Sequence, residues 1–316
     1  MARYLVTGAG GFVGPHLLRA LQDAGHEVWS TDRFALAGDV RHRICDLTDS
    51  EAVRALVDAL QPDGVLHLAS ASSVAQSFEH PQFALQNNLL SACNLFEAVR
   101  RSVPRARVLV VGSAEQYGIV RAADLPLREE HPLQPASPYA VSKVAQELLA
   151  LQYRSSWGTP VILTRSFNHS GPGQSDRFVL PGFARQIAEA EAGRREPVLH
   201  VGNLDVERDF LDVRDVARAY VLLMQKGEPG RAYNVCRGES HRLRDLVDAL
   251  VAHARADVRI EPDPTRMRPA DLPVLRGDPA RLRASTGWEP RLSMETTLAD
   301  VLEDWRRRIS GGNGQP

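Results

Sequence analysis

A glycine-rich turn near the start of the chain constrains the fold more than any other stretch. The segment "VTGAGGFVGPHLL" places Gly8, Gly11 and Gly14 between a short apolar run, Tyr4–Thr7, and a helical pattern of leucines. In a strand–turn–helix unit, the first glycine allows the tight turn and the second lets backbone N–H groups approach a pyrophosphate. The third lets helix and strand pack closely. The segment therefore predicts a dinucleotide-binding unit.

An acidic residue follows the second predicted strand at the distance that such a unit requires. Asp32 lies 18 residues after Gly14, where a ribose 2′-OH needs an acceptor. A carboxylate there repels a 2′-phosphate and favours NAD(H) over NADP(H). Arg33 follows directly and could pair with that phosphate, so NADP(H) stays open.

The first half of the chain alternates short apolar runs with helical patterns. Strands are predicted at residues 4–7, 28–31, 43–45, 65–68, 108–111 and 161–163. Apolar strands separated by helices favour a parallel sheet covered on both faces, and right-handed crossovers make it doubly wound. One of the helical patterns spans residues 53–60, with Thr48 and Glu51 as a predicted capping box before it.

The second half of the chain differs in composition from the first. Stretches rich in glycine and proline, such as "NHSGPGQSDR" and "EPDPTRMRPADLP", flank an amphipathic helix pattern at residues 243–251. We expect a Rossmann domain of residues 1–169, a smaller C-terminal α/β substrate domain of residues 170–309, and a disordered tail of residues 310–316. Residues 205–235 could return to the first domain, and the sequence leaves this open.

Composition argues against several classes of protein. The net charge of −1 without charge blocks disfavours nucleic acid and anionic membranes as partners, and no apolar run is long enough to span a bilayer. Three well-separated cysteines and no signal-peptide pattern predict a reducing cytoplasm. The ten histidines lack ligand spacing, so no metal is expected. We expect His67 to be packed and His169 to be a loop residue.

A tyrosine and a lysine four residues apart suggest acid–base chemistry. In "SPYAVSKVAQE", Ser137 can cap a helix and Pro138 suits its first position, which puts Tyr139 and Lys143 on one face. An ammonium beside a phenol lowers the phenol's pKa from about 10 and prepares it for proton transfer. Taken alone, such a pair is more often an ordinary packed tyrosine and a solvated lysine.

Further motifs decide between these interpretations. The glycine turn, Asp46 after the third strand, "HLAS" (67–70), "GSAEQYG" (112–118) and "YAVSK" (139–143) resemble, in this order, the extended short-chain dehydrogenase/reductase family, whose members act on nucleotide sugars. The resemblance implies a catalytic trio in which Ser113 orients the substrate oxygen, Tyr139 transfers the proton and Lys143 also holds the nicotinamide ribose. It implies cofactor contacts from Gly8, Gly11, Phe12, Val13, Gly14, Asp32, Arg33, Asp46, Leu47, Leu68, Ala69, Ser70, Asn88, Tyr139 and Lys143.

Three later stretches narrow the resemblance. "FNHSGPGQ", "VGNLDVERDF" and "RMRPADLP" resemble the branch that handles GDP-linked 6-deoxy-4-keto-hexoses. This implies NAD(P)H-dependent reduction of the C4 ketone, giving GDP-D-rhamnose or its C4 epimer. The alternatives are a GDP-mannose 4,6-dehydratase, a nucleotide-sugar 4-epimerase and, remotely, a non-catalytic cofactor-binding protein, which would be expected to lose the tyrosine or the lysine. The implied substrate contacts are Ser113, Glu115, Asn168, Phe178, Val179, Arg208 and Arg268.

Each of these arginines has another explanation when taken alone. Arginine suits a diphosphate because its fork matches phosphate oxygens. However, Glu207 and Asp209 flank Arg208, and Asp271 lies close to Arg268, so surface ion pairs are the commoner outcome. The resemblance also implies a homodimer that pairs through two long helices, around residues 81–102 and 138–157.

Positions 114 and 115 bear on the type of reaction. In the dehydratases that this chain resembles, a glutamate at the position of Glu115 removes the C5 proton. Reductases of the branch carry it too, whereas epimerases usually lack an acid there. Glu115 could instead hold a substrate hydroxyl or the loop. The dehydratases have aspartate or serine at the position of Ala114, which has no proton to give, and this favours reduction.

Overall fold

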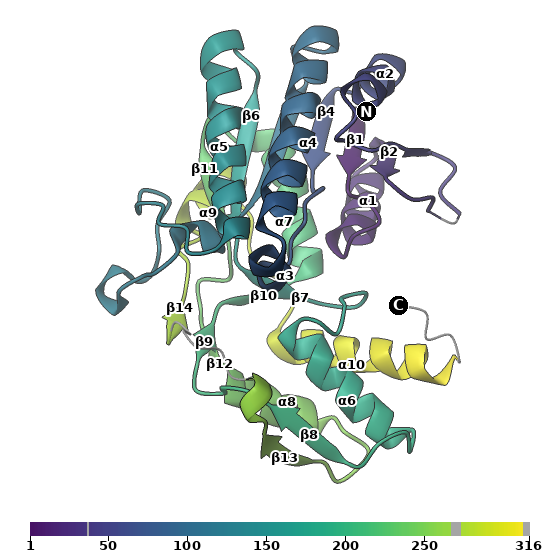
Figure 1. Cartoon of the computed structure of the whole chain (residues 1–316), viewed down its shortest axis with the longest axis vertical. Coiled ribbons are helices and arrows are strands. Elements are labelled where there is room, and N and C mark those ends of the chain that lie inside the picture. The colour runs from purple at the N-terminus through teal and green to yellow at the C-terminus, as the bar shows by residue number, and fades with distance from the viewer. Residues whose placement is uncertain (37, 267–272, 312–316) are drawn as a thin grey trace.

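The computed structural model describes residues 1–36, 38–266 and 273–311, and its centre is a parallel sheet of seven strands (Figure 1). The strand order is β11-β6-β5-β4-β1-β2-β3, so the direction of winding reverses between β1 and β4. The predicted doubly wound α/β fold is confirmed. The strands are β1 (Arg3–Thr7), β2 (Glu27–Asp32), β3 (His42–Ile44), β4 (Gly64–His67), β5 (Arg107–Ser113), β6 (Val161–Ser166) and β11 (Ala232–Val235).

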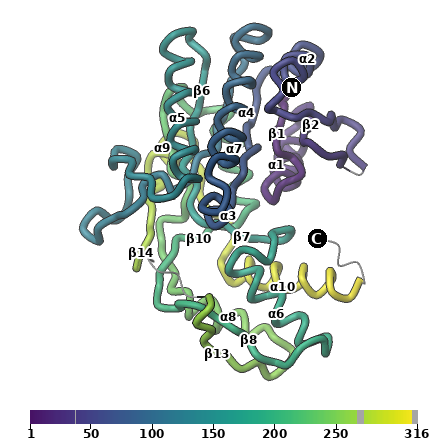
Figure 2. Tube along the Cα trace, in the orientation of Figure 1, coloured from purple at the N-terminus to yellow at the C-terminus, as the bar shows by residue number. Residues whose placement is uncertain are grey.

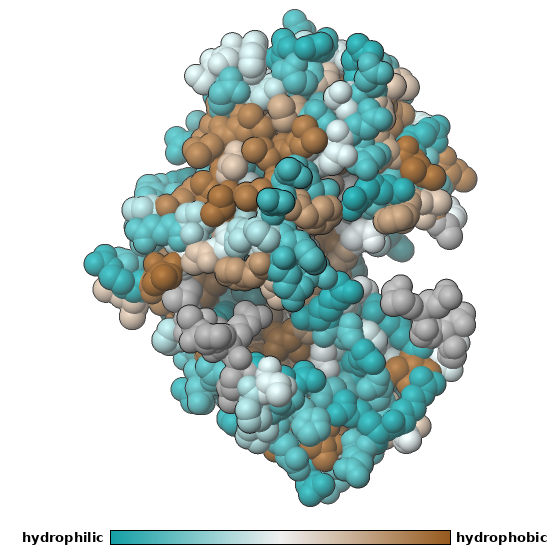
Figure 3. All heavy atoms as spheres, viewed as in Figure 1, coloured by the Kyte–Doolittle hydropathy of each residue, from teal (hydrophilic) through white to brown (hydrophobic). Residues whose placement is uncertain are grey.

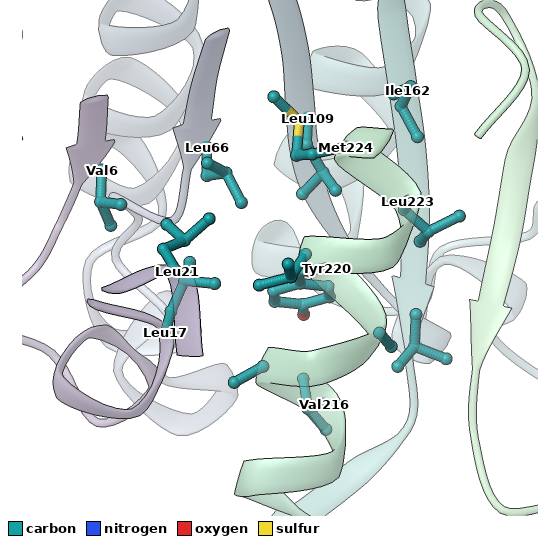
Figure 4. Packing of buried hydrophobic residues seen from close by; sticks show 14 of the residues in the cluster. Val6, Leu17, Leu21, Leu66, Leu109, Ile162, Val216, Tyr220, Leu223 and Met224 are labelled. Carbon is teal, nitrogen blue, oxygen red and sulfur yellow. The ribbon is translucent and has the colours of Figure 1, made fainter. Parts of the chain in front are cut away.

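Helices cover both faces of this sheet. On one face lie α1 (Val13–Asp23), α7 (Val213–Lys226) and α9 (Ala280–Thr286), and on the other lie α2 (Ser50–Leu60), α4 (Pro81–Ser102) and α5 (Pro138–Trp157), with α3 (Val74–Glu79) against α4 and α5. Figure 4 shows Leu17 and Leu21 of α1 and Tyr220 of α7 in one apolar cluster with residues of the strands, such as Val6 and Leu66. Within the described ranges, no helix is long and apolar enough to cross a bilayer.

The caps of two helices test the local predictions. Helix α5 begins as predicted, because the Ser137 hydroxyl accepts a hydrogen bond from Ala140 N at 3.1 Å. The predicted Thr48–Glu51 box before α2 is wrong. Asp49 is the cap, and its Oδ1 accepts from Glu51 N and Ala52 N at 3.0 and 3.1 Å, whereas Thr48 donates its hydroxyl to the Asp46 carboxylate. An aspartate one residue closer to the helix reaches its free N–H groups, so the threonine is not needed.

A smaller layered unit lies below the sheet in Figures 1 and 2, with an apolar core of its own. Its elements are α6 (Val179–Glu191), α8 (Leu243–Ala252), α10 (Met294–Ser310), β8 (Val198–Val201) and β13 (Arg259–Pro262). Two small separate sheets lie between it and the main sheet in Figure 1: β7 (Asn168–Ser170) pairs with β10 (Phe210–Asp212), and β9 (Glu207–Arg208) pairs with β12 (His241–Arg242) and β14 (Val274–Leu275). The short 3₁₀-helices are η1 (Ala114–Tyr117), η2 (Ala122–Asp124) and η3 (Pro264–Arg266).

The later chain crosses between the two units more than once. Residues 213–235, whose placement the sequence left open, form α7 and the edge strand β11 of the main sheet, and α9 packs beside them. We therefore propose a substrate domain that begins near residue 170 and is interrupted by these returns. Arg268 and residues 312–316 of the predicted tail lie outside the described residues.

Candidate active site

A cavity of about 640 Å³ opens at the carboxyl ends of the central strands. This is the edge at which doubly wound sheets bind ligands, next to the reversal of strand order. Eighteen predicted site residues line the cavity: Gly8, Gly11, Phe12, Val13, Gly14, Asp32, Arg33, Asp46, Leu47, Leu68, Ala69, Ser70, Ser113, Glu115, Tyr139, Lys143, Asn168 and Phe178.

The glycine turn is shaped for close backbone approach. Gly8 has a φ of +67°, and a Cβ there would lie 2.6 Å from Ala69 N, while a Cβ on Gly14 would lie 2.0 Å from the Ala9 oxygen. Gly10, which the motif did not single out, donates its N–H to Asp32 Oδ2 at 3.0 Å. The turn is thus tied to the acid at the end of β2.

Two buried hydroxyls show that the cavity suits a polar ligand. Thr31 and Ser70 line it, and the hydroxyl oxygen of each is buried without a hydrogen-bond partner in the described part of the chain. Buried hydroxyls are usually satisfied, so these two groups point to a ligand that supplies donors or acceptors. Together with the glycine turn, they fit a dinucleotide.

The four residues predicted to be catalytic meet at one side of this cavity. Ser113 ends β5, and Glu115 follows in η1. Tyr139 and Lys143 lie in the first turns of α5 and are only 8% and 3% exposed. Lys143 Nζ donates to the Val111 carbonyl at 2.8 Å and lies 5.9 Å from the centre of the tyrosine ring. The Ser113 side chain lies on the same side and acts to lower the pKa of the Tyr139 phenol.

A second cavity of about 260 Å³ adjoins the first, and Asn168 and Phe178 line both. Predicted substrate residues Val179 and Arg208 line it, as do two arginines that the sequence did not single out, Arg177 and Arg266. Arginine is the side chain that best matches the oxygens of a diphosphate, so a lining with three arginines is compatible with such a ligand, although Asp176 also lines this cavity and Arg266 pairs with Asp263 at 3.2 Å.

The comparisons with known proteins agree with this geometry. Residues 5–301 match the family model described as GDP-mannose 4,6 dehydratase. The chain belongs to this family. The predicted family of nucleotide-sugar oxidoreductases is thereby confirmed.

Members of the GDP-mannose 4,6 dehydratase family differ in their similarity to this chain. The GDP-6-deoxy-D-mannose reductase of Pseudomonas aeruginosa is 42% identical over 307 residues, which cover 97% of this chain and 98% of that protein. The GDP-mannose 4,6-dehydratase of Yersinia enterocolitica is 27% identical over 350 residues, covering 96% and 93%. The structure of RMD from Pseudomonas aeruginosa complexed with NADPH superimposes with a TM-score of 0.89, at 40% identity and with 98% and 100% coverage.

The pKa values of Tyr139 and Lys143 differ from the prediction. Burial raises the pKa of Tyr139 above its usual value, the Ser113 hydrogen bond lowers it in part, and Glu115 raises it further. Burial also lowers the pKa of Lys143 to about 7. The predicted lowering of the phenol's pKa by the lysine is therefore wrong for the chain by itself. Both groups are desolvated, and the ammonium points at a carbonyl.

One predicted cofactor contact of the family resemblance is misplaced. Asn88 is fully buried and lies outside the cavity, where its amide donates to Ser142 Oγ at 2.9 Å and accepts from Ala71 N at 2.7 Å. Its neighbour Asn87 lines the cavity instead. Adjacent residues of a helix point about 100° apart, and a motif match alone does not tell which of two asparagines faces the ligand.

The prediction for the two histidines near the site holds for His67 and fails for His169. His67 is buried, and its Nδ1 shares a hydrogen bond with Thr7 Oγ1 at 2.9 Å, in keeping with a packed residue. His169 was predicted to be a loop residue, and this is wrong, because it lies in strand β7. It lines the cavity and stacks on Phe12 with ring centres 5.8 Å apart.

The ion-pair explanation of Arg208 receives no support from Asp209. That carboxylate is fully buried and accepts hydrogen bonds from Arg237 N and Gly238 N at 2.8 and 3.0 Å. Burial raises its pKa to about 6, so it does not behave as a surface anion. Arg208 Nη1 donates to the Glu207 carbonyl at 2.9 Å, beside the second cavity.

Proposed function

We propose that this protein uses a reduced nicotinamide dinucleotide to reduce the C4 ketone of a GDP-linked 4-keto-6-deoxyhexose. The product would be GDP-D-rhamnose or its C4 epimer. The observation that carries the proposal is that Ser113, Tyr139 and Lys143 line the same cavity as the glycine turn. The similarity of the chain to a GDP-6-deoxy-D-mannose reductase supports the choice of substrate.

The chain's own groups account for the proton that the reaction needs. A bound reduced nicotinamide would supply the hydride to C4. Tyr139 keeps its proton at neutral pH because burial raises its pKa, so it can donate that proton to the developing alkoxide. Ser113 Oγ, next to the phenol, hydrogen-bonds the same oxygen and orients it. Lys143 is held by Val111 at the place where the nicotinamide ribose is expected.

A reductase is favoured over a dehydratase by position 114. Ala114 is buried and lines the cavity beside Ser113, and its methyl group offers no proton to a departing hydroxyl at C6. The experiment is to offer the enzyme and NADPH either GDP-mannose or the keto product that a dehydratase makes from it. We expect turnover of the keto product alone. Consumption of untreated GDP-mannose would instead support the dehydratase.

For the cofactor, we propose a preference for NADPH. Both oxygens of Asp32 already accept backbone hydrogen bonds, from Gly10 N at 3.0 Å and Arg33 N at 2.7 Å. The exposed Arg33 lines the same cavity and can pair with a 2′-phosphate. This revises the preference for NAD(H) that Asp32 suggested, and the NADPH complex of the similar RMD supports it.

We also propose that two copies pair through α4 and α5. Figure 3 shows hydrophobic atoms gathered over these helices. The exposed apolar residues on them are Phe83, Leu89, Leu90, Val141, Leu148 and Trp157. Large apolar surface of this kind is typical of an interface between subunits.

A further inference from the structure

A chain of buried polar side chains lies directly behind Ser113. Gln116, Glu147 and Arg165 are 0%, 6% and 5% exposed. Gln116 Nε2 donates to Glu147 Oε2 at 2.8 Å, and Arg165 donates to both oxygens of Glu147, at 2.6 and 3.1 Å. At the other end, Gln116 Oε1 accepts the backbone N–H of Ser113 at 2.8 Å. Three elements, η1, α5 and β6, thus meet at the carboxylate of Glu147.

The orientation of this amide is determined by its partners. Glu147 is paired with a guanidinium on both oxygens, so it can only accept hydrogen bonds. Gln116 must therefore present its NH₂ group to Glu147 and its oxygen to Ser113. The amide can reach the backbone because residue 112 is glycine, since a Cβ there would lie 2.3 Å from Gln116 Oε1.

Helix α5 connects this chain to the phenol. Tyr139, Lys143 and Glu147 follow one another at intervals of four residues, so they lie along one face of the helix. The first two meet the cavity, and the third holds Gln116. The link from Glu147 through Gln116 to Ser113 therefore sets the end of β5 against the start of α5, where Ser113 meets Tyr139.

Stability alone does not explain the arrangement. A buried ion pair gains little over apolar side chains of the same size, because both charges lose their hydration. Arg165 also donates to the Glu129 carbonyl at 2.9 Å and to Tyr117 Oη at 3.2 Å, so its charge is fixed in one position. A rigid polar chain of this kind suits the task of holding a reacting group in place.

We propose that Arg165, Glu147 and Gln116 are positioning residues that hold Ser113 at the correct distance from Tyr139 during reduction, an inference that rests on the proposed function. None of the three lines the cavity, so they act through Ser113 and not on the substrate. Their loss should slow the chemical step and leave ligand binding nearly unchanged.

The first test is Gln116→Met, which keeps the length of the side chain and removes both hydrogen bonds. We expect kcat for the keto sugar nucleotide to fall about 10- to 100-fold, because misplacement by about 1 Å has an effect of this size. The Kd for NADPH and the KM for the sugar nucleotide should stay close to those of the parent. The basic limb of the kcat profile should move to higher pH, because the Ser113 hydrogen bond lowers the pKa of Tyr139.

The matched control is Glu191→Gln, which weakens another bidentate ion pair, one that is partly buried. Arg306 donates to both oxygens of Glu191 at 2.7 Å in the smaller unit, on α10 and α6. We expect this variant to lose stability and keep kcat. An equal loss of kcat in both variants, or a parental kcat in Gln116→Met, would overturn the proposal. An inactive parent protein would instead contradict the proposed function.

A second variant, Gln116→Glu, keeps the test open if the methionine variant fails to fold. The charged group in contact with Gln116 is Glu147, and Arg165 and Tyr117 follow in the same buried network, with Arg165 also bound to the Glu129 carbonyl. A protonated carboxyl can still accept from Ser113 and donate to Glu147, so kcat should approach that of the parent at low pH. As pH rises and the carboxyl ionises beside Glu147, repulsion should reduce kcat. A constant ratio of kcat to the parent value across pH would overturn the proposal.

Discussion

At Tyr139, burial and hydrogen bonding act in opposite directions on the phenol, and burial dominates. We expect Tyr139→Phe to reduce the rate of keto-sugar reduction about 10²- to 10⁴-fold, the usual value of a positioned acid. NADPH should still bind, as followed by its fluorescence. Tyr153→Phe is the control on the same helix, because Tyr153 donates to Glu97 at 2.7 Å and lies outside the cavity. Near-parental turnover by Tyr139→Phe would contradict the assigned role.

Lys143 should make the stability of the cofactor-free protein depend on pH. Its pKa is about 7 in the fold and about 10.4 in an unfolded chain, so below pH 7 both states are protonated and the fold carries the full desolvation penalty. As pH rises from about 7 to about 10.4, the folded state releases the proton first and the penalty disappears. We expect Lys143→Met to be the more stable protein at about pH 6, by a few kcal/mol, with an advantage that shrinks towards about pH 10.

The measurement for Lys143→Met is thermal unfolding of variant and parent across this pH range. Loss of the hydrogen bond to Val111 offsets the gain in stability by about 1 kcal/mol at every pH. The change with pH of the stability difference between variant and parent is therefore more informative than its value at one pH. A difference between the two proteins that stays constant with pH would show that the lysine is not desolvated.

Arg33 should discriminate between the two cofactors. If its guanidinium pairs with the 2′-phosphate, Arg33→Ala should raise the Kd for NADPH about 10-fold, equivalent to about 1.4 kcal/mol, and change the Kd for NADH little. Arg43→Ala is a suitable control, because Arg43 stacks over Trp29 at 4.5 Å and does not line the cavity. Equal weakening of both cofactors by Arg33→Ala would refute the preference.

At the scale of the element, the cap of α2 gives a simple comparison. Asp49→Ala removes the acceptor of two N–H groups and should lower the free energy of unfolding by about 1 kcal/mol. Thr48→Ala removes only a bond to Asp46 and should have a smaller effect. Urea unfolding measures both. A larger loss of unfolding free energy in Thr48→Ala than in Asp49→Ala would support Thr48 as the cap, as the sequence suggested.

The elements that the sequence predicted are those determined locally. The six predicted strands, β1 to β6, are three to seven residues long and alternate with helical patterns. The glycine turn and the Tyr139–Lys143 spacing are also local, since each involves only neighbouring residues of the chain. Strand β11 was not predicted. Its four residues belong to the sheet because they pair with β6, which lies far away in the sequence. The same holds for Thr31, Arg177 and Arg266, which the fold brings to the cavities from separate segments.

At the scale of the whole molecule, the topology gathers the site from distant parts of the chain. The reversal of strand order beside β1 opens the cavity for the dinucleotide, and the returning α7 closes it from the other side, where Tyr220 lines the wall. The crossing at β7 and β10 then carries the chain into the smaller unit that holds the second cavity. One face of the sheet is left with its covering helices, α4 and α5, exposed to solvent.

That exposed face leads to the last prediction, which concerns assembly. A stable dimer usually buries about 1,600 Å² in total, and two α-helix pairs packed against each other can provide such an area. Leu148 is 58% exposed on α5, so Leu148→Glu would place a charge within the proposed interface, where desolvation without a partner is unfavourable. By light scattering, we expect twice the mass of the chain for the parent and a shift towards the single chain for the variant. Ile119→Glu, 71% exposed but in the loop after η1, should leave the dimer intact. A parent that is monomeric at micromolar concentration would show that the apolar face has another partner or none.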